Sequence, residues 1–70
     1  DANLILGIIN FKRNNLTDSE ILLLKAASIN NNDVQPLIYL MRLYIAKGDS
    51  IRAMQYENIL KAKGYNELVK

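Results

Sequence analysis

Residues 35–54 read QPLIYLMRLYIAKGDSIRAM and hold the clearest structural pattern in the chain. A long apolar segment follows Pro36, and a proline suits the first turn of a helix because its missing N–H has no helical partner there. Gly48 is expected to end this helix in the left-handed conformation. Asp49 or Ser50 then caps the next helix. The stretch therefore predicts two helices joined by a tight turn.

The C-terminal part of the chain continues this pattern. Apolar residues at helical spacing run as far as Leu60, and Gly64 is the expected stop, with Tyr65 folding back on Leu60. The segment 66–70 holds one more capping residue and two apolar residues. It either begins a short fifth helix or frays.

The N-terminal half predicts a second pair of helices. The segment 3–13, NLILGIINFKR, forms a wide apolar helical face and ends in two cations, which suit a helix C-terminus. Asp1 is its expected N-cap. Two asparagines at positions 14 and 15 interrupt the pattern before the next helix.

The start of that next helix carries a recognisable capping pattern. Thr17 and Glu20 have the spacing of a capping box, in which each side chain binds the backbone N–H of the other residue. Leu16 and Ile21 have the spacing of a hydrophobic staple. The helix is therefore predicted to begin at Asp18 and to end before the polar run NNND.

Composition excludes several classes of function. The 70 residues carry a net charge of +2, half of them are hydrophobic, and there is neither Cys nor His. The chain therefore fits one domain, 1–70, without disulfides or histidine ligands, and we expect no cofactor or metal site. No apolar run reaches the ~18 residues that a membrane span needs. Half apolar content in so short a chain implies either that some of this surface meets another protein or that four or five packed helices hide all of it.

No residue pattern predicts catalysis. Asp18 and Glu20 are close in sequence, but acids in the first turn of a helix are explained by the helix dipole. The serines have no His or Lys partner at a recognisable spacing. The three glycines are isolated, so no phosphate-binding loop is present. We therefore do not expect an enzyme.

The two halves of the chain are related by a shift of 34 residues. This shift brings Leu6 onto Leu40, Asn14 onto Gly48 and Ser19 onto Ala53. A period of 34 is that of tetratricopeptide repeats, each of which is a helix–turn–helix. The second half resembles this family in its spaced large residues, its Gly-Asp turn and its early small residue: Leu37, Leu40, Tyr44, Gly48, Asp49 and Ala53.

The resemblance covers nearly the whole chain but has departures. The first copy has Asn14 in place of the turn glycine and Asn10 where the family prefers an aromatic residue. In the second copy, Met41 and Leu60 stand where small residues are usual, which implies looser helix packing. The resemblance implies an all-α fold of four helices in antiparallel hairpins, with repeats at about 1–33 and 34–66. An unrelated four-helix bundle is the alternative.

The resemblance also implies a protein partner. Members of this family bind other proteins on the face lined by the first helix of each pair. Carried over to this chain, the groove residues are Leu4, Ile8, Phe11, Ile38, Tyr39, Arg42 and Ile45. These are mainly apolar, which suits an amphipathic helix of a partner rather than a carboxylate or a small molecule. Plain core packing is the competing explanation for each of them.

A finer resemblance concerns size. The chain is similar to the small tetratricopeptide-like chaperones of bacterial type III secretion systems, which hold the needle subunit in the cytoplasm. These chaperones cradle its amphipathic C-terminal helix, usually together with a second small helical co-chaperone. This resemblance implies a cytoplasmic virulence chaperone in a hetero-oligomer.

Two other readings remain open. In a helix-turn-helix DNA-binding domain, the helix after Gly48 would expose Arg52, Gln55, Asn58 and Lys61 along one side. A solvated face that includes Glu57 explains the same residues, so nucleic-acid binding is not favoured. The chain is alternatively one slice of a larger helical repeat scaffold.

Overall fold

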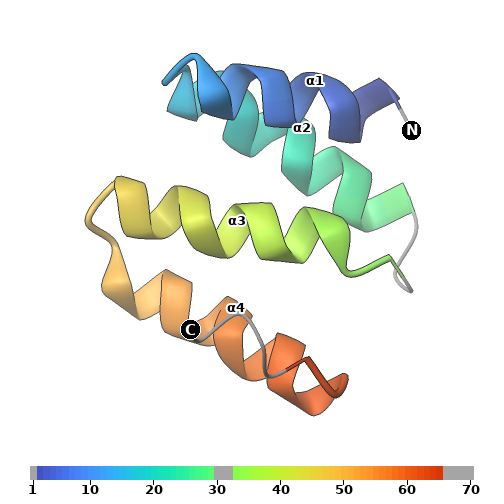
Figure 1. Ribbon diagram of the computed structural model, residues 1–70, viewed down its shortest axis with the longest axis vertical. Coiled ribbons are helices and arrows are strands. Elements are labelled where there is room, and N and C mark those ends of the chain that lie inside the picture. The colour runs from blue at the N-terminus through green and yellow to red at the C-terminus, as the bar shows by residue number, and fades with distance from the viewer. Residues whose placement is uncertain (1, 30–32, 66–70) are drawn as a thin grey trace.

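The computed structural model describes residues 2–29 and 33–65, and its secondary structure there is entirely helical. Four helices follow one another in the chain: α1 (Ala2–Lys12), α2 (Leu16–Ile29), α3 (Gln35–Ala46) and α4 (Ser50–Ala62). They form two antiparallel hairpins stacked on one another, and α1 lies beside α3 with the same direction (Figure 1). The predicted all-α fold of four helices is confirmed.

The turn after α1 explains why two asparagines can end a helix. Asn14 adopts the left-handed conformation with φ of 66°. Its amide donates to the carbonyl oxygen of Phe11 (3.0 Å), and the amide of Asn15 donates to that of Asn10 (2.8 Å). These two bonds form a Schellman motif, which satisfies carbonyl groups that the end of a helix leaves without partners.

Helices α3 and α4 end in the same way as α1. Gly48 and Gly64 have φ of 79° and 90°. The paired bonds are Gly48 N to Ile45 O (3.0 Å), Asp49 N to Tyr44 O (2.8 Å), Gly64 N to Lys61 O (3.0 Å) and Tyr65 N to Leu60 O (2.8 Å). The stops predicted at Gly48 and Gly64 are therefore confirmed.

The two hairpins match one another at an offset of 34 residues. The end of α1 at Lys12 corresponds to the end of α3 at Ala46, and the start of α2 at Leu16 corresponds to the start of α4 at Ser50. The two left-handed residues, Asn14 and Gly48, keep the same offset. One backbone geometry is thus used twice, although the side chains that fill it differ.

The capping box predicted at Thr17 and Glu20 is wrong. The turn closes so tightly that α2 already begins at Leu16, which places Thr17 inside the helix. The carboxylate of Glu20 binds the side chains of Tyr44 and Lys47 instead. The cap predicted for α4 is confirmed, because the Asp49 side chain accepts a hydrogen bond from the Arg52 amide (3.2 Å). The predicted cap at Asp1 and the possible fifth helix at 66–70 lie outside the described residues.

A buried close contact holds α1 against α2. The hydroxyl of Ser19 is fully buried and donates to the carbonyl oxygen of Gly7 (2.7 Å). A Cβ atom on Gly7 would lie 2.8 Å from a methyl carbon of Leu23, so any larger residue would force the buried Leu23 side chain to move. Glycine at this position in α1 and serine in α2 therefore fix the spacing of the first hairpin.

The hydrophobic core lies mainly in the second hairpin. Of its buried members only Leu23 comes from the first hairpin; the others are Ile38, Leu40, Met41, Leu43, Tyr44, Ala53 and Leu60. From α1, the apolar residues packed against this core are Leu4 and Phe11, and both are only partly buried. The second hairpin is therefore more deeply buried than the first.

The matched turns predict how position 48 tolerates substitution. Gly48→Ala should lower the free energy of unfolding by about 1 kcal/mol, because Ala is strained in the left-handed region even where no atom obstructs its Cβ. Gly48→Asn should cost less, since Asn14 already occupies the equivalent turn. Thermal unfolding followed by circular dichroism measures both variants. Equal losses for Ala and Asn would mean that the left-handed conformation does not control this turn.

Candidate protein-binding surface

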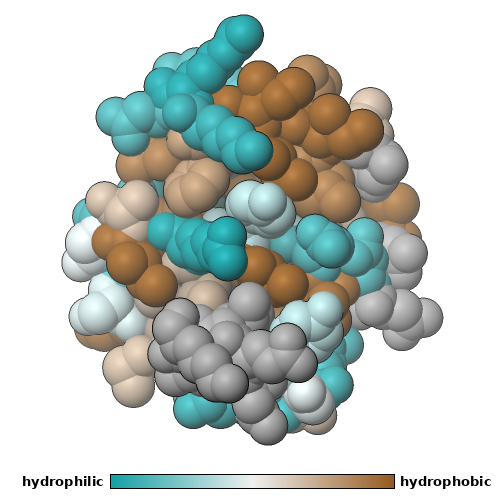
Figure 2. Space-filling model, in the orientation of Figure 1, coloured by the Kyte–Doolittle hydropathy of each residue, from teal (hydrophilic) through white to brown (hydrophobic). Residues whose placement is uncertain are grey.

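Each of the four helices leaves at least one large apolar side chain exposed. Within the described residues, the large hydrophobic side chains that remain exposed are Ile5, Leu6 and Ile9 on α1, Ile21, Leu24 and Ile29 on α2, Ile45 on α3, and Ile51, Met54 and Ile59 on α4. Figure 2 shows hydrophobic surface gathered over α1, which lies at the top of Figure 1. Soluble proteins that expose contiguous apolar patches generally use them to bind.

The seven predicted groove residues differ in exposure. Ile38 is buried in the core, whereas Arg42 and Ile45 are exposed. The remaining four are half-buried: Leu4, Ile8, Phe11 and Tyr39. Three of these also pack against the core: Leu4, Phe11 and Tyr39. The exposed members are therefore Arg42 and Ile45, and Ile8 is the half-buried member that does not pack against the core.

Three of these side chains meet where α1 and α3 lie side by side. The ring of Phe11 meets that of Tyr39 edge to face, with centroids 6.1 Å apart and planes at 76°. The Arg42 guanidinium carbon lies 5.7 Å from the centroid of the Tyr39 ring, in cation–π range. We call the surface formed by Ile8, Phe11, Tyr39 and Arg42 the α1–α3 face. Ile45 belongs to a different depression.

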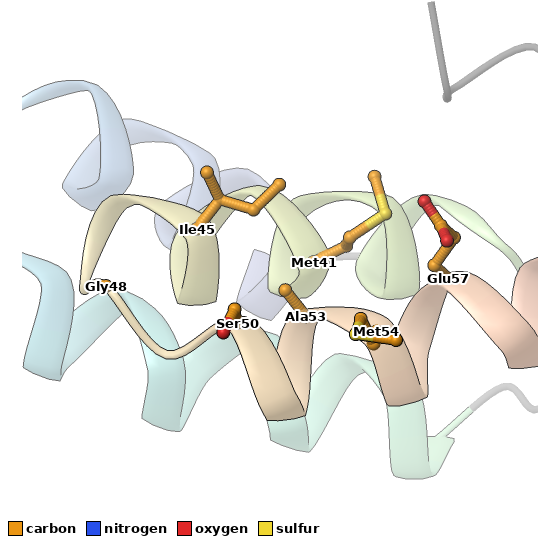
Figure 3. A pocket seen from close by; sticks show the side chains of 7 residues that line it. All are labelled: Met41, Ile45, Gly48, Ser50, Ala53, Met54 and Glu57. Atoms are coloured by element: carbon orange, nitrogen blue, oxygen red, sulfur yellow. The ribbon is translucent and has the colours of Figure 1, made fainter.

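A pocket of about 270 Å³ opens between α3 and α4. It is lined by Met41 and Ile45 of α3, Gly48 of the turn, and Ser50, Ala53, Met54 and Glu57 of α4 (Figure 3). Only Ile45 among these was predicted as a binding residue. Met41 and Met54 stand at helical spacing with other apolar residues. No local sequence pattern shows which side of a helix remains exposed to solvent. The pocket is smaller than most ligand cavities and suits inserted side chains.

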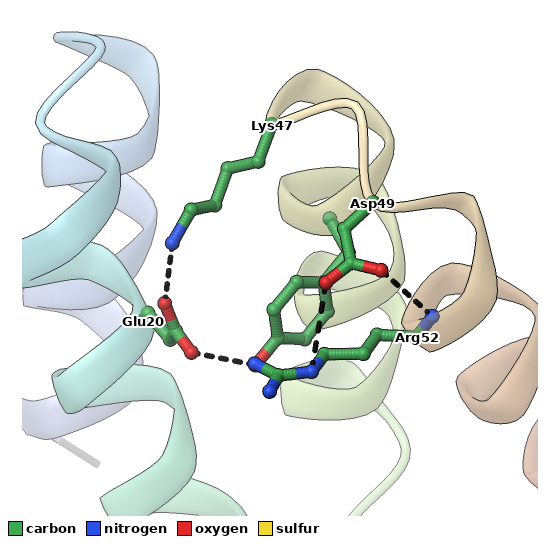
Figure 4. Close-up of polar contacts among 5 residues, drawn as sticks. Glu20, Lys47, Asp49 and Arg52 are labelled. Carbon is green, nitrogen blue, oxygen red and sulfur yellow. Dashed lines mark hydrogen bonds and ion pairs between the residues drawn. The ribbon is translucent and has the colours of Figure 1, made fainter.

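A polar cluster joins the two hairpins. The Glu20 carboxylate of α2 accepts hydrogen bonds from the hydroxyl of Tyr44 and the ammonium group of Lys47, both 2.7 Å long (Figure 4). Arg52 forms an ion pair with Asp49 at 3.5 Å. The Arg52 guanidinium carbon also lies 5.7 Å from the Tyr44 ring centroid.

These contacts shift the pKa values of the groups involved. The hydrogen bond from Lys47, followed by that from Tyr44, lowers the pKa of Glu20 below its usual 4.5. Burial, followed by the bond to Glu20, raises the pKa of Tyr44 to about 12, so its hydroxyl remains a proton donor at neutral pH. Each side chain of the cluster contacts another member of it. This arrangement fits a structural role, in which the cluster links the two hairpins. Across residues 2–29 and 33–65, no group of three or more acidic residues is placed to hold a metal ion.

Within the described part of the chain, no helix combines the length and the apolar character required to cross a membrane.

The lowered pKa of Glu20 predicts acid-sensitive stability. Because the folded-state pKa lies below the unfolded one, the ion cluster stabilises the fold above about pH 4.5, and this contribution is lost as pH falls further. Glu20→Gln should lower the free energy of unfolding by about 1–2 kcal/mol at neutral pH and by less at acidic pH. Urea denaturation at about pH 7 and about pH 3 measures both values.

The control is Asp18→Asn, which removes an exposed carboxylate from the same helix. It should change stability less than Glu20→Gln at neutral pH. If Glu20→Gln retained the full acid sensitivity of the unmodified chain, another carboxylate would be responsible.

Comparisons with protein families, with curated proteins and with solved structures gave no match to this chain. Its function therefore has to be inferred from the geometry and charge of its surfaces.

Proposed function

We propose that this chain is a protein-binding module that holds an amphipathic helix of a partner against its α1–α3 face. The observation that supports this most is the meeting of two parallel helices, with Phe11 and Tyr39 in contact and the exposed Arg42 over the Tyr39 ring. A seam between parallel helices accepts a third helix through side chains spaced one turn apart. No catalytic, metal-binding or cofactor-binding role forms part of the proposal.

The charge at the edge of the face suggests the character of the partner. Arg42 is exposed and lies over the ring of Tyr39. None of the contacts described above pairs it with an acidic residue. The whole chain carries a net charge of +2. A partner helix with one apolar stripe and an acidic flank would satisfy both Ile8 and Arg42. Acidic groups near Arg42 would add charge-assisted hydrogen bonds to the apolar contact.

The proposal includes a tetratricopeptide-like organisation. It is supported by helix bounds and left-handed turn residues that recur after 34 residues, the period of that family. The finer proposal follows only from the resemblance in size and pattern. It makes the amphipathic C-terminal helix of a type III secretion needle subunit the first partner to test, with the chain acting as its cytoplasmic chaperone alongside a co-chaperone.

Nucleic-acid binding through α4 is less favoured. Of the four residues proposed to face DNA, Arg52 is paired with Asp49 and Lys61 with Glu57, each at 3.5 Å. Exposed apolar side chains, among them Ile51 and Met54, share the same helix. Neutralised cations beside aliphatic groups provide little of the phosphate attraction on which nucleic-acid affinity depends.

The binding proposal can be tested with a synthetic helical peptide that has a leucine stripe and glutamates along one flank of that stripe. We expect its addition to the ¹⁵N-labelled chain to shift amide resonances of α1 and α3 above all. Ile8→Asp should weaken binding at least tenfold, since burying a charge at an apolar anchor costs more than the about 1.4 kcal/mol that corresponds to a tenfold change. Arg42→Glu should weaken it several-fold through repulsion of the acidic flank.

Ile59→Asp is the matched control, because it places the same charge at an exposed position on α4. It should leave the affinity nearly unchanged, and circular dichroism should show each variant folded. Shifts centred on α4, or equal losses from Ile8→Asp and Ile59→Asp, would contradict binding at the α1–α3 face.

A further inference from the structure

The 34-residue correspondence shows that α1 carries apolar side chains at positions whose counterparts in α3 are buried, yet those of α1 are exposed. Leu6 is 47% exposed, whereas its counterpart Leu40 in α3 is 0% exposed. Ile9 is 40% exposed, and its counterpart Leu43 is 0% exposed. The hairpins share their bounds and turns, so the difference in burial comes from their neighbours. Among the described helices, the first hairpin packs on α3, whereas α1 has no hairpin packed on its equivalent side.

The exposed residues form one continuous strip along α1. Their spacing of three, four and seven residues places them on the same side of the helix. We call this strip the α1 stripe; it consists of Ala2, Ile5, Leu6 and Ile9. At the equivalent places on α3 stand Pro36, Tyr39, Leu40 and Leu43, which are buried or half-buried. The α1 stripe thus has the apolar character of an interface that the second hairpin uses internally.

Within residues 33–65, the outer side of the second hairpin is exposed in the complementary way. In the first hairpin, Glu20 binds α3, but its counterpart Met54 is 60% exposed. Phe11 contacts Tyr39 of α3, but its counterpart Ile45 is 61% exposed. Both exposed residues line the α3–α4 pocket. The pocket therefore occupies the place where a following helix would pack as α3 packs on α1 and α2.

We propose that a second copy of this chain fills the pocket with its α1 stripe. In this arrangement α1 of one molecule lies on α3 and α4 of another, repeating the packing of α3 on the first hairpin. Ile5 then takes the place of Tyr39 and meets Ile45. Glu57 stays at the rim, where Lys61 already lies 3.5 Å away and offsets its charge.

This contact is heterologous, because two different surfaces meet. A heterologous contact that does not close into a ring adds copies in an open series. The interface uses the two ends of the stacked hairpins and leaves Ile8 and Arg42 of the α1–α3 face outside it. Loss of self-association and loss of partner binding can therefore be distinguished by separate variants.

Sedimentation of the 8.0 kDa chain over about 10 µM to 1 mM tests the proposal. We expect the average mass to rise with concentration beyond that of a dimer. Leu6→Glu removes the α1 stripe, and Met54→Glu removes the pocket wall; each variant alone should remain monomeric. Both positions are exposed, and circular dichroism checks that both variants fold.

Mixing the two variants provides the decisive measurement. Met54→Glu keeps an intact α1 stripe and Leu6→Glu keeps an intact pocket, so an equimolar mixture should form a dimer and nothing larger. Ile59→Glu, at an exposed position of α4 outside the pocket, should associate like the unmodified chain. An unmodified chain that stays monomeric throughout, a mixture without dimer, or a control that also blocks association would each overturn the proposal.

Discussion

A two-helix hairpin with apolar residues on both sides needs a neighbour, and this constraint determines the structure. Each hairpin buries the seam between its own helices, but the outer sides of those helices remain apolar. Stacking covers one outer side of each hairpin, and this is why Leu40 and Leu43 are fully buried while Leu6 and Ile9 are not. The contribution of such burial is large, at about 1.5–3 kcal/mol for a side chain of this size. Two hairpins leave two outer sides without that contribution.

Polar contacts fix the geometry within which this burial occurs. The buried hydroxyl of Ser19 binds the Gly7 carbonyl and sets the spacing of α1 and α2, which glycine makes possible. Glu20 then binds Tyr44 and Lys47 and sets the position of the second hairpin on the first. Apolar contacts alone tolerate sliding of one helix along another, whereas hydrogen bonds of 2.7 Å do not. The register of the stack is therefore specified by a few polar atoms.

Sequence patterns predicted the helices well because helix ends are local. Gly48 and Gly64 end helices through bonds within six residues, and the same holds for Asn14. The capping box failed because the spacing of Thr17 and Glu20 is local, whereas the partner of Glu20 is 24 residues away. Exposure could not be predicted for a similar reason. Leu6 and Leu40 are identical residues in equivalent positions, and only the neighbouring hairpin makes one a surface group and the other core.

The α1–α3 face and the two ends of the stack support one another physically. In a head-to-tail pair, α1 of the second copy lies beside α3 of the first, so the seam between parallel helices continues from one molecule to the next. A partner helix longer than a single seam would then contact both copies at once. Once the helix is bound to one copy, its binding to the second copy would behave as an intramolecular step. This would raise the affinity of the helix without any new type of interaction. By the same linkage, a bound helix would stabilise the stacked pair, because it binds the pair more tightly than it binds a monomer. Self-association and partner binding would thus be favourably coupled, although they use different residues.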